Sequence, residues 1–392
     1  MMELLWLLLP VAAFSGWVVG RGRSVSRSGG GDEGPGTSLR EDYFQGLQHL
    51  LHEESDKAIE VFTRMVEVDS ETVETHLALG SLFRRRGEVE RAIRIHQNLI
   101  ARPSLHREQR TNALLELGED YLRAGLLDRA ENLFQEVVDA GSHVPQALER
   151  LREIYQQEKE WQRAIQAASR LESLTGARMG PRIAQFYCEQ AEAAQHQGEI
   201  NNARDLLRRA LTADPACVRA SLLQGDLERT VGNFKQALKC YQRVREQDPE
   251  YLSEILPGMQ ECYVQLGRAR AFRQYLEGIP VAQRGASVIL ALAERIRHED
   301  GEAAAAGYLV EELRRRPTVR GLNRLIELNL ARTAQPGDDD LEVLRELFQS
   351  LLRDKPGYVC HSCGFRGRSL RWQCPGCRAW GTIKPIQGIE GE

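Results

Sequence analysis

The stretch Gly118–Phe134 reads GEDYLRAGLLDRAENLF, and its spacing decides how the chain folds. A glycine is followed twelve residues later by an alanine and four residues after that by a bulky side chain. From Leu126 onward, apolar residues recur three and four positions apart, which is the spacing of one face of a helix. The stretch therefore predicts two helices that join near Gly125 and approach each other closely at the small residues.

The same pattern recurs along the chain. Three further copies keep its spacing: Gly46, Ala58 and Phe62; Gly80, Ala92 and His96; Gly225, Ala237 and Tyr241. Less regular copies surround Ala164 and Ala203. One glycine also recurs between the helices of each pair: Gly87, Gly125, Gly198, Gly232, Gly267 and Gly301. Because a single helical hairpin cannot bury its apolar face alone, the copies are expected to stack on one another.

With a period of about 34 residues, this pattern resembles the tetratricopeptide repeat. The resemblance implies an all-α superhelix of about eight to nine helix pairs over residues 39–355, with a concave surface that binds other proteins. His96 stands where other copies carry an aromatic residue, so we expect a buried or half-buried histidine. The arginine runs at 84–86 and 314–316 end predicted helices, and we expect them to be solvated.

Two Cys-x-x-Cys pairs lie near the C-terminus. They consist of Cys360, Cys363, Cys374 and Cys377, with ten residues between the pairs. Four thiolates complete the tetrahedral shell that zinc or iron accepts. Residues 356–392 are too few to bury a sufficient core, so a bound metal ion would hold this segment together. A pair of disulfides or a redox-active pair fits this spacing less well.

The remaining cysteines are scattered singly through helical sequence, and we expect them to be small buried apolar side chains. They are Cys188, Cys217, Cys240 and Cys262.

The cysteine segment is locally basic. Five cations and no acidic residue occur between Gly357 and Ile389: Arg366, Arg368, Arg371, Arg378 and Lys384. One interpretation is a nucleic-acid-binding ribbon in which Trp372 and Trp380 stack on bases. The other is structural, with the arginines offsetting thiolate charge and the tryptophans packing the ribbon on the last repeats. We favour the structural interpretation, since the whole chain carries a formal net charge of −4.

The N-terminus carries an uncharged apolar run, Leu4 to Val19, which predicts a single transmembrane anchor over residues 1–20. A cleaved signal peptide would begin with a basic region, whereas here the only early charge is Glu3. Arginines follow the run at positions 21, 23 and 27, so the positive-inside rule puts the bulk of the chain on the cytoplasmic side. Residues 21–38 are Gly/Ser/Arg-rich, which is typical of a flexible linker.

The sequence carries no recognisable catalytic motif. It contains no Walker loop and no Gly-x-Ser-x-Gly elbow, and a metal held by four thiolates has no open position for water. We therefore expect no catalytic residue, no organic cofactor and no enzymatic activity.

The order of parts is an anchor, a repeat array and a four-cysteine terminus. Together with Trp372–Trp380 (WQCPGCRAW) and Gly381–Pro385 (GTIKP), it resembles the lipopolysaccharide assembly protein B family of Gram-negative bacteria over the full chain. The resemblance implies a rubredoxin-like terminus whose four cysteines hold one iron or zinc ion. It also implies an inner-membrane regulator of lipopolysaccharide synthesis.

Such a regulator would help the membrane protease FtsH degrade the deacetylase that commits precursor to lipid A, and would gather lipopolysaccharide-synthesis proteins at the inner membrane. Two alternatives remain open: an electron-transfer protein with a four-thiolate iron, and a nucleic-acid-binding ribbon on a repeat scaffold. Arg378 stands where rubredoxins carry glycine, and the loop between the cysteine pairs is short. Both departures speak against electron transfer, while a homodimer remains open.

Overall fold

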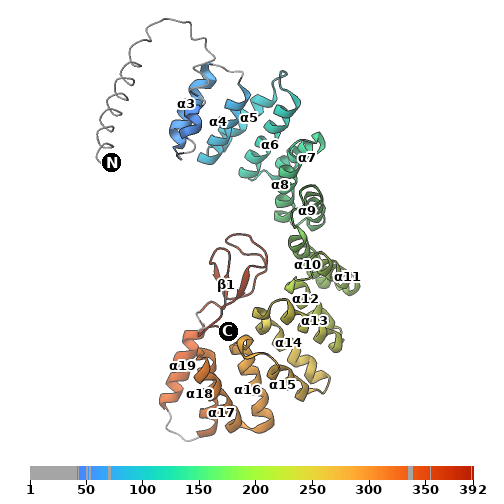
Figure 1. Cartoon of the computed structure of the whole chain (residues 1–392), viewed down its shortest axis with the longest axis vertical. Helices are drawn as coiled ribbons and strands as arrows, with labels where there is room; N and C mark the ends of the chain where they lie inside the picture. The colour runs from blue at the N-terminus through green and yellow to red at the C-terminus, as the bar shows by residue number, and fades with distance from the viewer. Residues whose placement is uncertain are drawn as a thin grey trace, which may run out of the picture. The chain divides into compact units, whose positions relative to one another are not determined.

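The structure is a computed structural model, and it describes residues 42, 44–49, 52, 54–68, 72–333, 339–353, 355–389 and 391–392 (Figure 1). The expected membrane anchor, residues 1–20, and the expected linker, residues 21–38, lie outside this part. Among the described helices, none has the length and apolar character that crossing a membrane requires.

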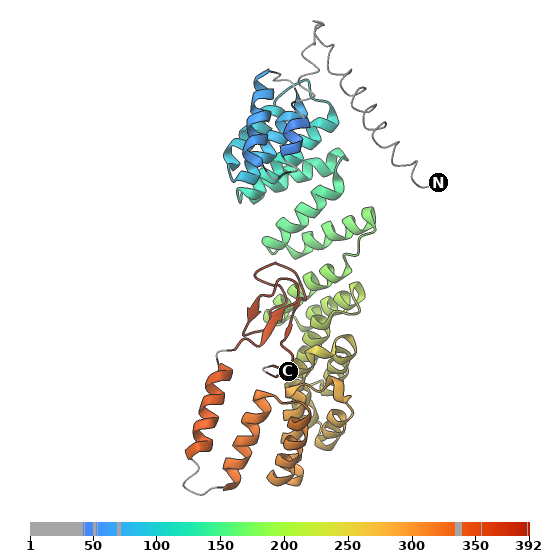
Figure 2. The ribbon, with the colours of Figure 1, turned by 60° about the vertical axis from the view of Figure 1, so that its left-hand side comes forward.

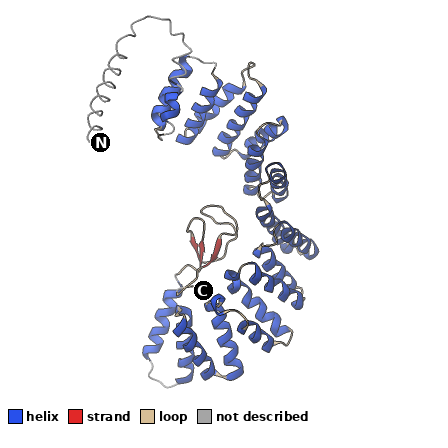
Figure 3. Ribbon diagram, in the orientation of Figure 1, coloured by secondary structure: helices blue, strands red, loops and turns tan. Residues whose placement is uncertain are grey.

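The chain divides into two compact units, residues 1–143 and residues 144–392. Helices make up almost all of the described regular structure, and strands occur only near the C-terminus (Figure 3). The first unit contains α3 (Ser55–Val68), α4 (Val73–Arg86), α5 (Val89–Ile100), α6 (Arg107–Arg123) and α7 (Leu127–Ala140).

The second unit continues the helical array and adds a small sheet. Its first helices are α8 (Val144–Gln157), α9 (Trp161–Thr175), α10 (Gly180–His196), α11 (Ile200–Ala213), α12 (Val218–Thr230) and α13 (Phe234–Gln247). Next come η1 (Pro249–Tyr251), α14 (Leu252–Gln265), α15 (Ala269–Glu277), η2 (Val281–Gln283), α16 (Ala286–Asp300), α17 (Glu302–Arg315), α18 (Val319–Thr333) and α19 (Asp339–Arg353). The strands are β1 (Tyr358–Cys360), β2 (Arg366–Gly367) and β3 (Ile383–Pro385).

The helices form consecutive hairpins, with α4 packed on α5, α6 on α7, and so on to α18 on α19. The glycines predicted between the helices all adopt positive φ, between 65° and 92°, a conformation that other residues avoid. The repeat prediction is therefore confirmed at the level of helices and turns.

The small and bulky residues of the repeat pattern contact each other as predicted. A Cβ atom added to Gly118 would lie 2.6 Å from the ring of Phe134, and one added to Gly225 would lie 2.5 Å from the ring of Tyr241. The glycines are needed because the second helix of these hairpins places a large side chain against the backbone of the first. This contact explains the fixed spacing in the sequence.

In one hairpin, α8 with α9, the small and the bulky residue of the repeat pattern exchange positions. Arg152 lies 34 residues after Gly118, and Ala168 lies 34 residues after Phe134, so the bulky residue has moved to the first helix. Arg152 is buried, and its Nη2 donates to Oε1 of Glu149 at 2.7 Å. This exchange explains why the sequence pattern fades here although the hairpin persists.

Of two expectations about side chains, the structure confirms one and corrects the other. His96 is fully buried, which agrees with a core histidine. Arg84 was expected to be solvated with its neighbours, but it is half-buried and forms ion pairs with Glu116 and Asp120, both at 2.7 Å. Arg84 lies on the face of α4 that contacts α6, and the run of three arginines in the sequence did not predict this.

All four single cysteines are buried, as expected. Burial raises the pKa of the Cys240 and Cys262 thiols to about 11, so both remain protonated at neutral pH.

The C-terminal sheet has the strand order β2-β1-β3, and both pairings are antiparallel. Val359 pairs with Arg366 on one side and with Lys384 on the other. In both views, this ribbon lies inside the curve that helices α8 to α18 of the second unit form (Figures 1 and 2).

Candidate metal centre

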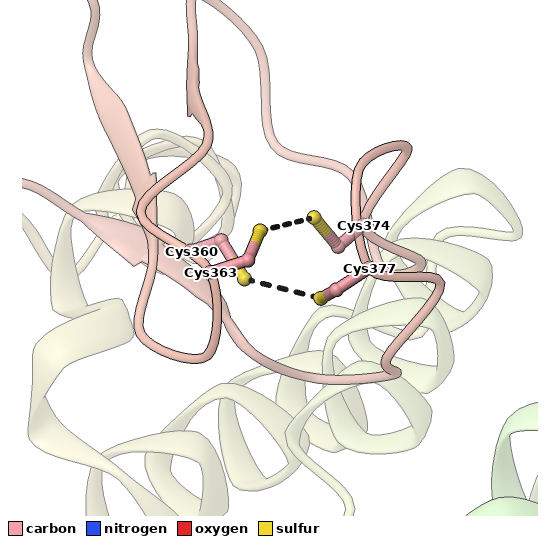
Figure 4. Close-up of side chains that lie close together, drawn as sticks. All are labelled: Cys360, Cys363, Cys374 and Cys377. Atoms are coloured by element: carbon pink, nitrogen blue, oxygen red, sulfur yellow. Dashed lines mark hydrogen bonds between the residues drawn. The ribbon is translucent and has the colours of Figure 1, made fainter. Parts of the chain in front are cut away.

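Each cysteine pair lies in a tight turn of the same construction. The Gly364 amide donates to the Cys360 carbonyl at 2.9 Å, and the Arg378 amide donates to the Cys374 carbonyl at 2.8 Å. Gly364 and Arg378 both have positive φ, at 76° and 59°. The two turns face each other, and each contributes two sulfur atoms to the space between them (Figure 4).

The four sulfur atoms gather at one point, all within 4.8 Å of one another. The Sγ atoms of Cys360 and Cys377 are 3.8 Å apart, and those of Cys363 and Cys374 are 3.6 Å apart. A tetrahedral ion with metal–sulfur bonds of about 2.3 Å would separate its sulfurs by about 3.8 Å. A disulfide would instead bring two sulfurs to about 2.05 Å. The spacing therefore fits four ligands of one ion, and it does not fit disulfides.

Hydrogen bonds to sulfur favour the thiolate at Cys360, one of the four cysteines. Burial alone would raise the pKa of Cys360, but the Thr382 hydroxyl and the backbone amides of Cys363 and Ser362 lower it to about 6. The Thr382 Oγ1 lies 3.2 Å from the Cys360 sulfur, and the Ser362 amide donates to it at 3.4 Å. Thiolate is the form of cysteine that binds metal, so this chemistry suits one zinc or iron ion.

Trp380 makes one of the contacts between the ribbon and the repeats. Its indole Nε1 donates to the Gln156 Oε1 at 3.3 Å. Its ring lies edge-on to Trp161 and Phe186, with centroid distances of 6.4 and 6.2 Å. The Arg219 guanidinium carbon lies 5.7 Å from the same ring. We call the four residues around Trp380, namely Gln156, Trp161, Phe186 and Arg219, the indole seat.

Trp372 makes a second contact of the same kind. Its ring stacks on Tyr251 with a centroid distance of 5.5 Å and an interplanar angle of 22°. The Tyr251 hydroxyl donates to the Ile383 carbonyl in β3 at 2.9 Å. One tyrosine of the repeats thus contacts both a side chain and a backbone strand of the ribbon.

Charged and polar contacts surround these aromatic residues. Lys384 in β3 forms ion pairs with Asp248 at 2.7 Å and with Glu250 at 2.6 Å. The Tyr358 hydroxyl in β1 donates to Glu254 in α14 at 3.0 Å. The ammonium group of Lys384 is therefore neutralised by two carboxylates of the repeats.

The tail after β3 reaches the later helices. The Glu392 carboxylate accepts hydrogen bonds from the Ser287 amide at 2.9 Å and the Ser287 hydroxyl at 2.6 Å, and it also contacts Arg320. The Ile389 carbonyl accepts from the Val319 amide, at the start of α18. A carboxylate at the start of α16 is also favoured by the helix dipole.

The structure corrects where the tryptophans bind. They were expected to pack on the last repeats, but they contact α8, α9, α10, α12 and η1, and the tail reaches α16 and α18. Both tryptophans are only partly exposed, and each ring packs on side chains of the repeats. This arrangement favours the structural interpretation of the ribbon.

The spacing of the four cysteines predicted that they cluster, as the structure shows, but nothing in the sequence analysis predicted the indole seat. One signal was present, because the α8–α9 copy of the repeat is degenerate. The Nη1 of Arg152, at the reversed position, donates to the Gln156 Oε1 at 3.2 Å, and that oxygen also accepts from Trp380. A departure from the repeat pattern thus marks the place where the ribbon binds.

The fold and the site define a class: a tetratricopeptide repeat protein that ends in a rubredoxin-like four-cysteine ribbon. Residues 358–385 match the family described as the rubredoxin metal binding domain. Residues 75–110, 115–181 and 188–251 match tetratricopeptide repeat families. The chain belongs to the lipopolysaccharide assembly protein B family.

Relatives named lipopolysaccharide assembly protein B establish that membership. The protein of Escherichia coli K12 is 42% identical over 393 residues, covering 100% of both chains. The protein of Haemophilus influenzae Rd is 36% identical over 400 residues, again covering 100% of both. Among solved structures, YrrB, described as a TPR protein with an unusual peptide-binding site, is 16% identical, with a TM-score of 0.34, and covers 50% of this chain and 95% of its own.

Proposed function

We propose that this protein is a non-enzymatic adaptor for lipopolysaccharide assembly, tethered to the inner membrane by residues 1–20 with its bulk on the cytoplasmic side. The observation that carries the proposal is the match to lipopolysaccharide assembly protein B over the full length of both chains. A repeat array that presents a protein-binding surface supports the adaptor role. Residues 21–38 would link the anchor to the array, residues 39–355, and to the ribbon, residues 356–392.

In this proposal Cys360, Cys363, Cys374 and Cys377 hold one zinc or iron ion. The ion would supply the cross-link that a segment of this size cannot obtain from its own core. Among the described residues of the ribbon, Cys360, Cys374, Ile383 and Pro385 are buried, so two of the four core residues are themselves cysteines. The role of the ion is then structural: it fixes the two turns and thereby Trp372 and Trp380.

We further propose that the adaptor brings the committing lipid A deacetylase to the membrane protease FtsH and gathers lipopolysaccharide-synthesis proteins. A membrane tether raises the effective concentration of client and protease, which favours even weak contacts. The array itself would bind the client, either as a monomer or as a homodimer.

The experiment compares the wild-type protein with the Cys360→Ser/Cys363→Ser variant in cells. Deacetylase half-life is measured after synthesis is blocked, and FtsH is recovered with the full-length membrane protein. The expected result is a longer half-life and reduced metal content in the variant. A variant that has lost its metal but keeps the wild-type half-life would refute the functional role of the ion.

An electron-transfer role has one observation in its favour, because Cys363 and Cys377 are exposed and would leave an edge of the site open to a redox partner. Purified full-length protein that contains iron and shows a reversible one-electron couple would support it. Colourless protein that contains zinc would exclude it.

A further inference from the structure

The indole seat contains every element that recognition of a tryptophan side chain requires. Gln156 supplies an acceptor for the ring N–H, Trp161 and Phe186 supply two aromatic walls, and Arg219 supplies a cation beside the ring. Contacts of these kinds are directional, and together they select an indole over a phenyl ring, which lacks the N–H. The ligand class is thus fixed by the seat itself.

The seat is built by the repeats and holds together without its ligand. Trp161 stacks on Phe186 with a centroid distance of 5.7 Å and an interplanar angle of 24°. Arg219, only 2% exposed, is fixed by Glu189 at 2.7 Å and by Glu192 at 2.8 Å. None of these contacts involves the ribbon, so the repeats themselves hold the aromatic walls and the cation of the seat in place.

The position of Trp380, in contrast, depends on the ribbon. It follows Cys377 by three residues and pairs with Gln373 in a β-bridge. The Gly381 amide next to it donates to the Trp372 carbonyl at 2.7 Å. These backbone contacts flank the second cysteine turn on both sides, and the metal ion would fix that turn.

We propose that the indole seat is a docking site for tryptophan-bearing protein segments, occupied by Trp380 of the same chain while the ribbon is folded. A partner segment that carries a tryptophan binds there once the ribbon is displaced. Because Trp380 and the partner compete for one site, metal loading and partner binding oppose each other, and the coupling is reciprocal. The gating by metal rests on the proposed metal role, whereas the seat itself does not.

The first test vacates the seat without touching the cysteines. The probe is a fluorescent linear peptide with the sequence of residues 378–386, and the protein is the full-length, metal-loaded chain in detergent. We expect the Trp380→Ala variant to bind the probe at least tenfold more tightly than the wild type does. A second substitution in the seat, Trp161→Ala, should abolish this gain, and a probe with alanine in place of tryptophan should not bind.

Equal affinity of Trp380→Ala and wild type for the probe would overturn the proposal, as would unchanged binding by Trp380→Ala/Trp161→Ala. Circular dichroism of each variant shows whether the repeats remain folded. Trp372→Ala serves as the comparison, because it removes a ribbon tryptophan that stacks on Tyr251 and lies 6.0 Å from the Arg219 guanidinium carbon, yet it leaves Trp380 in the seat. It should bind the probe less tightly than Trp380→Ala does.

The second test examines the coupling from the side of the metal. Trp161 is not among the predicted metal ligands, yet Trp161→Ala should release the ion to a chelator at least fivefold faster than the wild type. Conversely, stripping the ion from the wild type should expose the seat to the probe. If Trp380→Ala binds the probe but neither of these effects occurs, the metal gate is wrong. Neither test uses lipopolysaccharide, so a negative result would contradict the docking site without contradicting the adaptor role.

Discussion

The Nδ1 of His96 lies 2.6 Å from the Oδ2 of Asp120, and both side chains are fully buried. His96 occupies the position that Phe62 and Phe134 hold in the neighbouring repeats. The second carboxylate oxygen of Asp120 accepts from Arg84 at 2.7 Å. A polar network has thus replaced an aromatic contact at one repeat of the first unit.

His96→Phe would restore the residue found in the neighbouring copies, yet we expect it to destabilise α5 and α6 by about 1–3 kcal/mol, because Asp120 loses a buried partner. Hydrogen exchange of the amides of both helices measures the effect. In His96→Phe/Asp120→Leu, which matches Leu82 of the preceding hairpin, much of the loss should be recovered. A single variant at least as stable as the wild type would show that the network is dispensable.

Close packing at the repeat glycines predicts a large effect for a single methyl group. Gly118→Ala should cost about 1–3 kcal/mol, because the new Cβ would lie 2.6 Å from the Phe134 ring. Gly307 is the control: it is exposed inside α17, and nothing lies within 4 Å of its added Cβ. Gly307→Ala should stabilise by about 0.5–1 kcal/mol. Thermal unfolding of both variants is the measurement, and shifts of the same sign would contradict the packing argument.

Arg378 is strained where Gly364, its equivalent in the other cysteine turn, is not. A non-glycine residue at positive φ costs about 1–2 kcal/mol, so Arg378→Gly should slow release of the metal to a chelator by roughly fivefold. Gly364→Ala should accelerate it for the same reason. Arg378→Lys keeps both the charge and the strain, and it should behave like the wild type. If the glycine variant releases the ion as fast as the lysine variant and the wild type do, backbone strain at position 378 does not govern metal retention.

How much the sequence reveals depends on how local each contact is. The pattern of Gly118, Ala130 and Phe134 predicts the hairpins because one helix must send a bulky side chain against a small residue of its neighbour. The four cysteines are likewise within 18 positions of one another, so their spacing alone predicts the cluster.

The indole seat was beyond prediction for the opposite reason. Gln156 and Trp380 are separated by 224 positions, and no periodicity relates them. The same holds for Tyr251 and Ile383, which are 132 positions apart. Only the exchange of sizes at Arg152 and Ala168 hinted that the array changes its role there. Contacts of this kind follow from the way the ribbon folds back, which the pattern of either part does not contain.

Glu294 links two neighbouring repeats and gives the second unit a defined sensitivity to acid. Its carboxylate in α16 accepts from Arg297 at 2.6 Å and from Arg324 in α18, also at 2.6 Å. The hydrogen bond from Arg297, reinforced by that from Arg324, lowers the pKa of Glu294 to about 2 although burial opposes the change. The unfolded chain has a glutamate pKa of about 4.3.

Between pH about 4.3 and 2, the unfolded state therefore binds more protons at this position than the folded state. The stability of the folded state consequently decreases as the pH is lowered through this range. The contribution of Glu294 is fully present above that window and is lost below it. Glu294→Gln should consequently be less stable than the wild type at pH 6, and the difference should vanish as the pH approaches 2. Hydrogen exchange or thermal unfolding of the second unit across this range measures it.

Arg324→Gln provides the matched variant, because it removes the partner on α18 and keeps the carboxylate together with Arg297. The pKa of Glu294 in the folded state should then rise toward its ordinary value. The pH range over which stability is lost therefore becomes narrower, because its lower limit moves up. A stability difference between Glu294→Gln and the wild type that stays constant from pH 6 to pH 2 would show that the ion pairs do not stabilise the folded array. A pH-dependent difference between Glu294→Gln and Glu294 that persists in the Arg324→Gln background would show that the contact with Arg297, within α16, stabilises the helix on its own.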